Sequence, residues 1–392
     1  MAGAAPTGIL RAMSKRRRYE TGSAELNRDI ENLVARASSL LGNAEGSEYV
    51  RELVVTSLRL LHDRGSVGDL KLLNASMKEL RHAFRVFAPY EHARKVAVFG
   101  SARTTPEHAD WKAAHRFSEQ LARAGWMIIT GAGPGVMRAA NGGAGRQASF
   151  GVNIRLPYEQ TANEVIAGDP KLINFRYFFT RKLMFVKEAH AIALFPGGFG
   201  THDEGFEALT LVQTGKSQML PIVFVDSPGG SYWRDWEEYV RTHLVERQLV
   251  GPHDLSLFRV TDDVGAAVRE VLGFYANFHS SRYVGEHLVL RVCHAPSDAE
   301  CRALEREFRD LLTGGGIEVR GALPEEAGEA AELPRVVFPF NRRDNGRLRE
   351  LIDRLNALVP EPASPPLGAA PREIPPERLP SEAEREEEAL DA

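Results

Sequence analysis

Short, continuously apolar runs recur through the middle of this 392-residue chain and alternate with amphipathic stretches. Such runs are typical of strands that are covered on both faces of a parallel sheet, and the stretches between them are typical of crossover helices. The pattern therefore predicts an α/β fold with an open, doubly wound parallel sheet. The predicted strands are residues 95–99, 126–130, 150–154, 191–195, 221–225 and 257–260. The predicted helices include 174–190 and 106–124; the second has Thr105 as its cap and Pro106 in its first turn.

The pattern changes on both sides of this domain. Apolar residues recur every three to four positions at 49–63 and 69–87, which predicts two amphipathic helices that need a packing partner. A mixture of short apolar runs and helical patterns near the C-terminus predicts a small α+β domain. The predicted organisation is a disordered basic tail (1–22), a helical segment (23–93), the α/β domain (94–280), the α+β domain (284–359) and a disordered acidic, Pro-rich tail (360–392).

Composition then narrows the class of protein. A net charge of −4 gives no general attraction to nucleic acid or anionic lipid. No apolar run approaches the ~18 residues that span a bilayer, and the basic N-terminus has no apolar segment beside it that would form a secretory signal. The two cysteines, Cys293 and Cys301, lack CxxC spacing, and the histidines do not cluster. We therefore expect a cytoplasmic protein without a metal site, a nucleic-acid partner or a membrane partner.

Glycine-rich loops follow three of the predicted strands: FGSART at 99–104, TGAGPGVM at 130–137 and FPGGFGT at 195–201. The carboxyl ends of parallel strands meet at one edge of the sheet, so these loops are expected to lie together. Glycine lets backbone N–H groups approach and surround an anion, and the helix that follows adds its positive end. The three loops predict a phosphate-binding site.

The loops do not fit two common phosphate-binding motifs. Gly131, Gly133 and Gly135 form GxGxG, but Val136 occupies the region where a further spaced glycine belongs, and no acid follows the next strand. No GK[ST] sequence completes a Walker A loop. We therefore expect neither a dinucleotide cofactor nor a nucleoside triphosphate of the P-loop kind.

Charged residues flank the third loop. Glu204 falls in the first turn of a helix that is predicted to begin near Thr201; such a carboxylate either stabilises the helix start or faces a ribose attached to the bound phosphate. Arg181 and Lys182 are either solvated charges or cations that complete the site. Asp203 is interpreted as a helix-start acid.

The residues RK followed by PGGFGTHDE resemble the paired signature RK … PGGxGTxxE of the LOG ("lonely guy") family. The resemblance extends over residues 94–280 and implies a Rossmann-like fold, a homodimer or higher homo-oligomer, and phosphoribohydrolase activity. Plant members act on cytokinin ribotides, and bacterial members act on AMP and other nucleotides. The family was formerly labelled lysine decarboxylase, but no lysine here lies in a setting suited to pyridoxal phosphate.

The resemblance also implies roles for individual residues. The catalytic pair is Arg181 and Glu204. No cofactor and no metal are implied. The substrate-binding residues are Gly197, Gly198, Gly200 and Thr201 around the phosphate, Gly100, Ser101, Gly133 and Gly135 around the nucleotide, and Asn153 and Lys182 beside them.

The expected function is hydrolysis of the N-glycosidic bond of a purine, AMP-like nucleoside 5′-monophosphate, as in nucleotide salvage. The alternative is a non-catalytic carrier of a phosphorylated ligand, similar to molybdenum-cofactor carrier proteins. The Arg181–Glu204 pair favours the enzyme, because a carrier has no use for a carboxylate at the ribose. A third hypothesis makes the protein regulatory, with Arg342, Arg343 and Arg347 either sensing an anion or forming a solvated helix start.

Overall fold

A computed structural model of the chain describes residues 19–42, 46–63, 65–155, 161–326 and 328–359. The chain divides into two compact units, Met1–Met77 and Lys78–Ala392, which are described separately. Nearly all of the predicted N-terminal tail and the whole of the predicted C-terminal tail lie outside the described residues. The predicted domain boundaries stay predictions.

The first unit consists of α1 (Ala24–Leu41), α2 (Ser47–His62) and the first half of α3 (Val67–Phe87). The Ser23 side chain caps α1 by accepting a hydrogen bond from the Leu26 N–H. Contact between α1 and α2 is made through Ile30, Val34 and Val55. Most of the apolar stripe predicted for residues 49–63 stays exposed, because α2 turns Val55 toward α1 instead.

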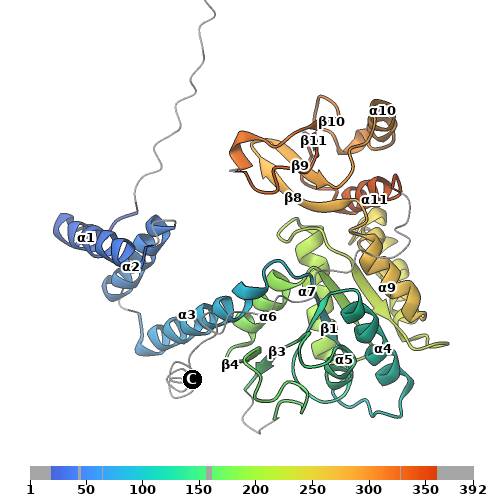
Figure 1. Ribbon diagram of the computed structural model, residues 1–392, viewed down its shortest axis with the longest axis horizontal. Coiled ribbons are helices and arrows are strands. Elements are labelled where there is room, and N and C mark those ends of the chain that lie inside the picture. The colour runs from blue at the N-terminus through green and yellow to red at the C-terminus, as the bar shows by residue number, and fades with distance from the viewer. Residues whose placement is uncertain (1–18, 43–45, 64, 156–160, 327, 360–392) are drawn as a thin grey trace, which may run out of the picture. The chain divides into compact units, whose positions relative to one another are not determined.

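The second unit is built on a seven-stranded parallel sheet with the order β4-β3-β2-β1-β5-β6-β7 (Figure 1). The predicted doubly wound, Rossmann-like α/β fold is thereby confirmed. From β1 the chain adds β2, β3 and β4 on one side. It then crosses back to place β5 on the other side of β1, followed by β6 and β7, so the strand order reverses between β1 and β5. The strands are β1 (Lys95–Phe99), β2 (Met127–Thr130), β3 (Ser149–Ile154), β4 (Leu172–Phe175), β5 (Ala191–Leu194), β6 (Ile222–Val225) and β7 (Phe258–Thr261).

Helices cover both faces of this sheet, which explains why its central strands are mostly apolar. In β1, Val96 and Val98 pack on one face, and Ala97 and Phe99 pack on the other. The first face is covered by α4 (Ala109–Arg123), α5 (Val136–Ala144) and α9 (Val264–Gly273). The second is covered by the end of α3, α6 (Phe178–Glu188), α7 (Phe199–Gln213) and α8 (Tyr232–Tyr239).

Two local predictions were wrong. The helix predicted over 174–190 starts only at Phe178, because residues 172–175 pair with β3 as the edge strand β4. The helix predicted over 106–124 starts at Ala109, because the His108 ring, rather than Thr105, accepts the hydrogen bond of the Asp110 N–H.

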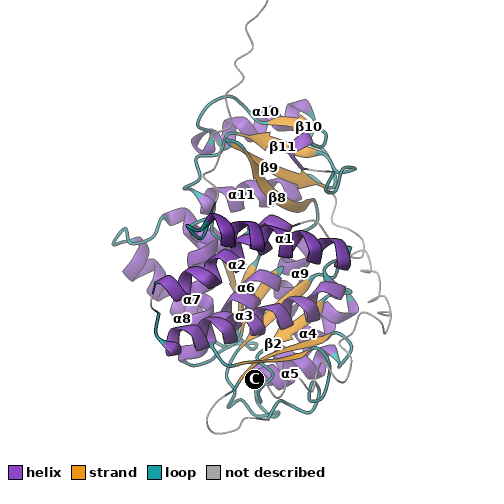
Figure 2. Ribbon diagram, turned by 90° about the vertical axis from the view of Figure 1, so that its left-hand side faces the viewer, coloured by secondary structure: helices purple, strands orange, loops and turns teal. Residues whose placement is uncertain are grey.

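A small antiparallel sheet forms the C-terminal part of the second unit (Figure 2). Glu326 is buried there between two arginines, 3.0 Å from the Arg335 Nε and 2.8 Å from an Arg291 guanidinium nitrogen. The sheet has the order β10-β11-β9-β8, and its elements are β8 (Phe278–Val284), β9 (His287–Val292), α10 (Asp298–Glu307), β10 (Glu318–Arg320), β11 (Arg335–Phe338) and α11 (Asn345–Asn356).

The start of α11 packs closely on the parallel-sheet domain. The Asn345 Nδ2 donates to the Gln213 carbonyl at the end of α7, at 2.9 Å. A Cβ on Gly346 would lie 2.2 Å from the His253 carbonyl oxygen, so only glycine permits this approach. Arg347, whose side chain is 16% exposed, pairs with Asp310 at 2.9 Å and with Glu350.

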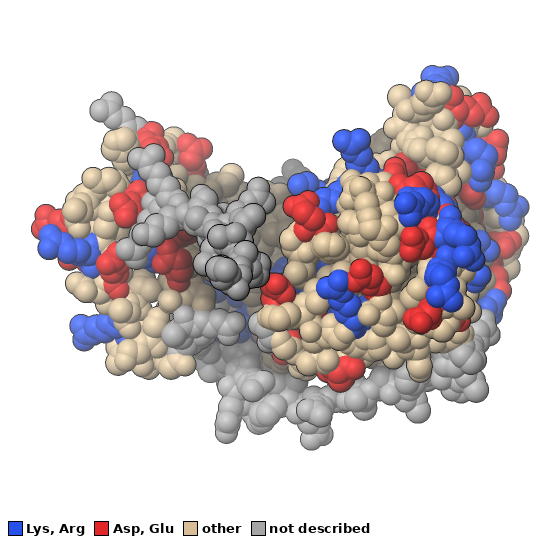
Figure 3. Space-filling model, turned by 90° about the horizontal axis from the view of Figure 1, so that it is seen from above, with Lys and Arg blue, Asp and Glu red and all other residues tan. Residues whose placement is uncertain are grey.

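The charged surface of the second unit is mixed. On the face seen in Figure 3, basic and acidic side chains lie side by side over this unit. None of the helices in the described parts of the chain has the length and apolar character needed to cross a membrane.

Candidate active site

A cavity of about 690 Å³ opens at the point where the strand order reverses. The loops after β1 and β5 lie side by side there: the Ser101 N–H donates to the Pro196 carbonyl at 3.0 Å, and the Phe195 N–H donates to the Phe99 carbonyl at 2.9 Å. This is the place where ligands bind in open α/β sheets. The cavity is lined by residues 99–103, Met137, Phe178, Arg181, residues 197–204 and Tyr232.

Most of the predicted site residues meet at this cavity, although they come from three separate segments of the chain. Those that line it are Gly100, Ser101, Arg181, Gly197, Gly198, Gly200, Thr201 and Glu204. Those that do not line it are Gly133, Gly135, Asn153 and Lys182.

The N-terminus of α7 forms one end of the cavity. The first N–H groups of a helix have no partner within it, and Gly198 caps α7 without a side-chain hydrogen bond. A Cβ on Gly198 or Gly200 would meet no atom within 4 Å, so both open into free space. At Gly197 a Cβ would lie 2.1 Å from the Thr201 Oγ1, so glycine is required for the loop to pack. These features suit an anion.

Glu204 lies on the first turns of α7 and faces an environment that disfavours its charge. Burial raises the pKa of its carboxyl group to about 7, against the opposing attraction of Lys182 and Arg181; Glu207 and Asp203 raise it further. Within the described residues, no side chain hydrogen-bonds to or forms an ion pair with this carboxylate. A carboxyl group near pKa 7 is suited to general acid–base catalysis or to stabilising a developing positive charge.

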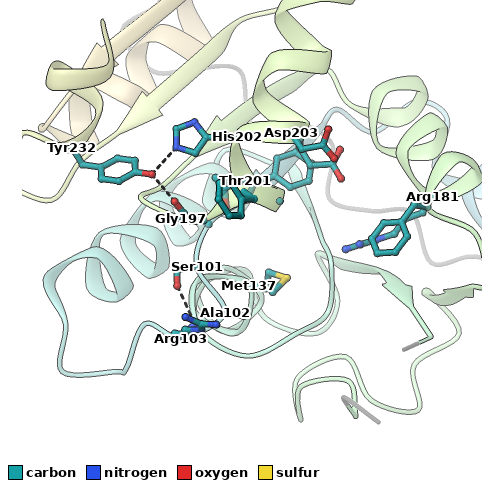
Figure 4. Close-up of a pocket in the computed structure, with 17 residues that line it drawn as sticks. Ser101, Ala102, Arg103, Met137, Arg181, Gly197, Thr201, His202, Asp203 and Tyr232 are labelled. Carbon is teal, nitrogen blue, oxygen red and sulfur yellow. Dashed lines mark hydrogen bonds between the residues drawn. The ribbon is translucent and has the colours of Figure 1, made fainter. Parts of the chain in front are cut away.

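Arg181 extends from α6 toward the cavity (Figure 4). Its Nε donates to the Val152 carbonyl of β3 at 2.9 Å, which fixes the guanidinium group. Burial lowers the pKa of this guanidinium group, and the Glu204 charge opposes that effect. A Cβ on Gly131 would lie 2.4 Å from the Arg181 Nη2, so the glycines of the second loop make room for the arginine, and of residues 130–137 only Met137 lines the cavity.

Three of the predicted residues outside the cavity make contacts elsewhere in the domain. Gly135 has φ +67°, and a Cβ on it would lie 2.2 Å from the Ser101 carbonyl oxygen, so it lets α5 approach the first loop. The Gly133 carbonyl accepts a hydrogen bond from Asn163 at 3.1 Å. Asn153 donates to Asn174 at 3.0 Å.

The Lys182 ammonium group is directed toward carboxylates on α7. It lies 2.9 Å from an Asp203 oxygen and 2.8 Å from a Glu207 oxygen. Burial lowers the pKa of Lys182, but the hydrogen bonds to Asp203 and Glu207 outweigh burial and leave it raised. The lysine therefore ties α6 to α7, and Asp203 serves as its partner.

The sequence reasoning missed several residues that line the cavity. Tyr232, from α8, donates its hydroxyl to the Gly197 carbonyl at 2.5 Å and lies 2.7 Å from the His202 Nε2 (Figure 4). His202 falls on a variable position of the PGGxGTxxE pattern, and Tyr232 lies outside it, so no local signal marks either. The other lining residues not predicted are Phe99, Ala102, Arg103, Met137, Phe178, Phe199 and Asp203.

The residues present do not suggest a metal centre. Across the described ranges, no three His, Cys, Asp or Glu side chains are grouped so that they could hold a metal ion. The cavity instead combines an open helix N-terminus, a desolvated carboxyl group and an anchored guanidinium group. Such a set can bind an anionic ligand and stabilise positive charge beside it.

Comparison with known proteins identifies related sequences and structures. Residues 135–271 match the family model described as possible lysine decarboxylase. A pyrimidine/purine nucleotide 5′-monophosphate nucleosidase of Escherichia coli strain K12, and its counterpart in strain O157:H7, are each 32% identical to this chain over 138 residues. The match spans 32% of this chain and only 30% of the relative's length.

Two solved structures are similar at lower identity. The molybdenum cofactor binding protein of Rippkaea orientalis is 20% identical, with a TM-score of 0.33. The molybdenum cofactor carrier protein of Chlamydomonas reinhardtii is 22% identical, with a TM-score of 0.32. Each match covers 45% of this chain and 94% of the other.

Proposed function

Because residues 135–271 of this chain belong to the LOG family, we propose that the protein hydrolyses the N-glycosidic bond of a nucleoside 5′-monophosphate. The products are the free base and ribose 5-phosphate, and the proposed substrate is a purine nucleotide such as AMP. The observation that carries the proposal is the meeting of Glu204, Arg181 and the open N-terminus of α7 in one cavity.

The 5′-phosphate binds at the N-terminus of α7. Backbone N–H groups of residues 198–200 donate to its oxygens, and the positive end of the helix favours its charge. Gly198 and Gly200 leave space for the phosphate, because a Cβ at either would project into open space. Apolar and aromatic side chains, Met137, Phe178 and Phe199, line the same cavity and suit the planar base.

Glu204 acts on the ribose. As the C1′–N bond breaks, positive charge develops on the sugar, and a carboxylate beside it stabilises that charge. The same carboxylate accepts a proton from the attacking water, whose oxygen forms the new bond to C1′. The electron pair of the broken C1′–N bond leaves with the base, which takes up the proton that Glu204 returns. A pKa of about 7 lets Glu204 accept and return a proton near neutral pH.

Arg181 fixes the geometry of the reacting groups. Its hydrogen bond to the Val152 carbonyl holds the guanidinium group at the cavity before the substrate arrives. A preset cation next to the substrate anion reduces the reorganisation needed in the reaction. The name of the Escherichia coli relatives supports this reaction class and leaves the choice of base to be measured.

The test is to incubate the purified full-length chain with AMP, GMP, IMP, CMP and UMP and to separate the products by chromatography. The expected result is release of free base and ribose 5-phosphate from the monophosphates, fastest with a purine. Adenosine, which lacks the phosphate, should be a poor substrate.

Two outcomes would contradict the proposal. Equal rates with adenosine and AMP would remove the role of the phosphate site. Tight binding of nucleotides without release of base would favour the carrier alternative instead.

A further inference from the structure

We propose that Tyr232 is a positioning residue that holds the loop at 197–201 in its phosphate-binding shape, and that His202 fixes the direction of the Tyr232 hydroxyl. The inference rests on the proposed function only in taking this loop to hold the substrate phosphate. It concerns α8, which follows β6 and carries no part of the RK … PGGxGTxxE pattern.

The Tyr232 hydroxyl forms a hydrogen bond to the backbone of the phosphate-binding loop. It donates its single proton to the Gly197 carbonyl at 2.5 Å. Gly197 directly precedes the cap of α7, so this hydrogen bond restrains the peptide that turns the chain into the helix. A glycine has the least intrinsic stiffness of any residue, so the loop depends on contacts from outside.

His202 determines which way that proton points. The His202 Nε2 lies 2.7 Å from the Tyr232 oxygen. Since the hydroxyl proton is used on Gly197, the imidazole must carry its proton on Nε2 and donate it to the Tyr232 oxygen. Burial lowers the pKa of His202, so the ring is neutral at pH 7, where this tautomer supplies the donor.

Contacts with the parallel sheet fix the start of α8, and they thereby fix the position of Tyr232. Asp226, 2% exposed and directly after β6, accepts a hydrogen bond from the Trp233 N–H at 2.9 Å. The Trp233 ring is fully buried and packs edge-on against Phe224 of β6. The support therefore runs from the sheet through Asp226 and Trp233 to Tyr232 and the loop.

The first experiment measures equilibrium binding of inorganic phosphate and of ribose 5-phosphate, without turnover. In Tyr232→Phe the ring remains and only the hydroxyl is lost, so both ligands should bind about three- to tenfold more weakly, as expected for one lost hydrogen bond. His202→Leu should weaken binding by a similar factor. His202→Gln, which can place an amide N–H near the Nε2 position, should restore most of it.

Tyr239→Phe is the matched control. Tyr239 also lies on α8 and does not line the cavity, so its loss of hydroxyl should leave phosphate binding unchanged. Adenosine binding should be the same in Tyr232→Phe and the wild-type chain, since adenosine has no phosphate. If the chain turns over AMP, Tyr232→Phe should raise KM more than it lowers kcat.

The double variant Tyr232→Phe/His202→Leu separates a shared support from two independent contacts. Because both side chains act through one hydrogen bond to Gly197, the double variant should bind phosphate no more weakly than either single variant.

Several results would overturn the inference. These are unchanged phosphate binding in Tyr232→Phe, a His202→Gln variant as weak as His202→Leu, additive losses in the double variant, or no phosphate binding by the wild-type chain. Phosphate binding by a wild-type chain that releases no base would refute the proposed hydrolysis and leave the role of Tyr232 intact.

Discussion

Glu204 is held where its charged form is disfavoured, which is typical of a residue kept for chemistry rather than stability. We predict that Glu204→Gln keeps less than a tenth of the wild-type rate of base release, a loss of at least ~1.4 kcal/mol of transition-state stabilisation. At pH 8 the variant should also unfold at a higher temperature, because a carboxyl with a raised folded-state pKa opposes folding when it is ionised.

The check is AMP turnover alongside thermal unfolding. Glu119→Gln is the control, since Glu119 only pairs with Arg123 on the surface of α4. A Glu204→Gln variant with near-normal turnover would remove Glu204 from the reaction.

The same pKa predicts a pH profile. If Glu204 must be ionised in the free enzyme, kcat/KM for AMP should rise with pH up to about 7 and then level off. The substrate phosphate also titrates near pH 6, so the profile should be compared with the pH dependence of inhibition by ribose 5-phosphate. A rise in kcat/KM confined to the range of phosphate ionisation would argue against Glu204 as the titrating group.

At the scale of elements, the second glycine-rich loop acts through Arg181. We predict that Gly131→Ala lowers kcat/KM about tenfold or more while changing the unfolding temperature little. A Cβ there would meet the Arg181 Nη2 at 2.4 Å and the Met137 sulfur at 2.8 Å, and both are ends of flexible side chains that can move aside. The arginine would then leave its place in the cavity.

The control for this prediction is Gly142→Ala on α5, where the added Cβ makes an ordinary contact 3.6 Å from the His115 ring. That variant should keep its activity, because alanine favours a helix. Loss of stability rather than activity in Gly131→Ala would show that the loop, and not the arginine, gave way.

Elements defined by local patterns were predictable, and elements defined by distant partners were not. Apolar runs revealed six strands of the parallel sheet, because covered strands are apolar throughout. The edge strand β4 was missed, because its four-residue sequence LINF is too short to show a clear alternation of apolar and polar residues. In the cavity, the glycine loops carry their own signal, whereas Tyr232 reaches Gly197 across 35 positions of sequence.

At the scale of the whole molecule, the small antiparallel sheet depends on a buried charge. Burial alone would raise the pKa of Glu326, but hydrogen bonds from Arg335, the Leu323 N–H and Arg291 lower it to about 2. This contribution is complete above the ordinary pKa near 4.5 and is lost as pH falls toward 2. We predict that the unfolding temperature of the chain falls steeply as the pH is lowered from about 4.5 toward 2.

Glu326→Gln should remove part of that dependence. At pH 7 the variant should be less stable by about 3–5 kcal/mol, because it leaves the buried Arg335 without its carboxylate and Arg291 with Glu329 alone. Its unfolding temperature should then change less between pH 5 and pH 3 than that of the wild-type chain. Parallel curves for the two proteins would refute the assignment to Glu326.

The cavity is lined partly by backbone N–H groups and partly by side chains, and mutation affects these two kinds of group differently. The wall at α7 offers backbone N–H groups, which every residue type except proline retains, so point mutation cannot readily redirect it. Other elements contribute side chains to the lining, including Arg103, Met137 and Phe178. If the chain hydrolyses nucleotides as proposed, substitutions of these side chains can change the preferred base while Glu204 and the helix N-terminus stay the same, so new substrate preferences should arise at these side chains.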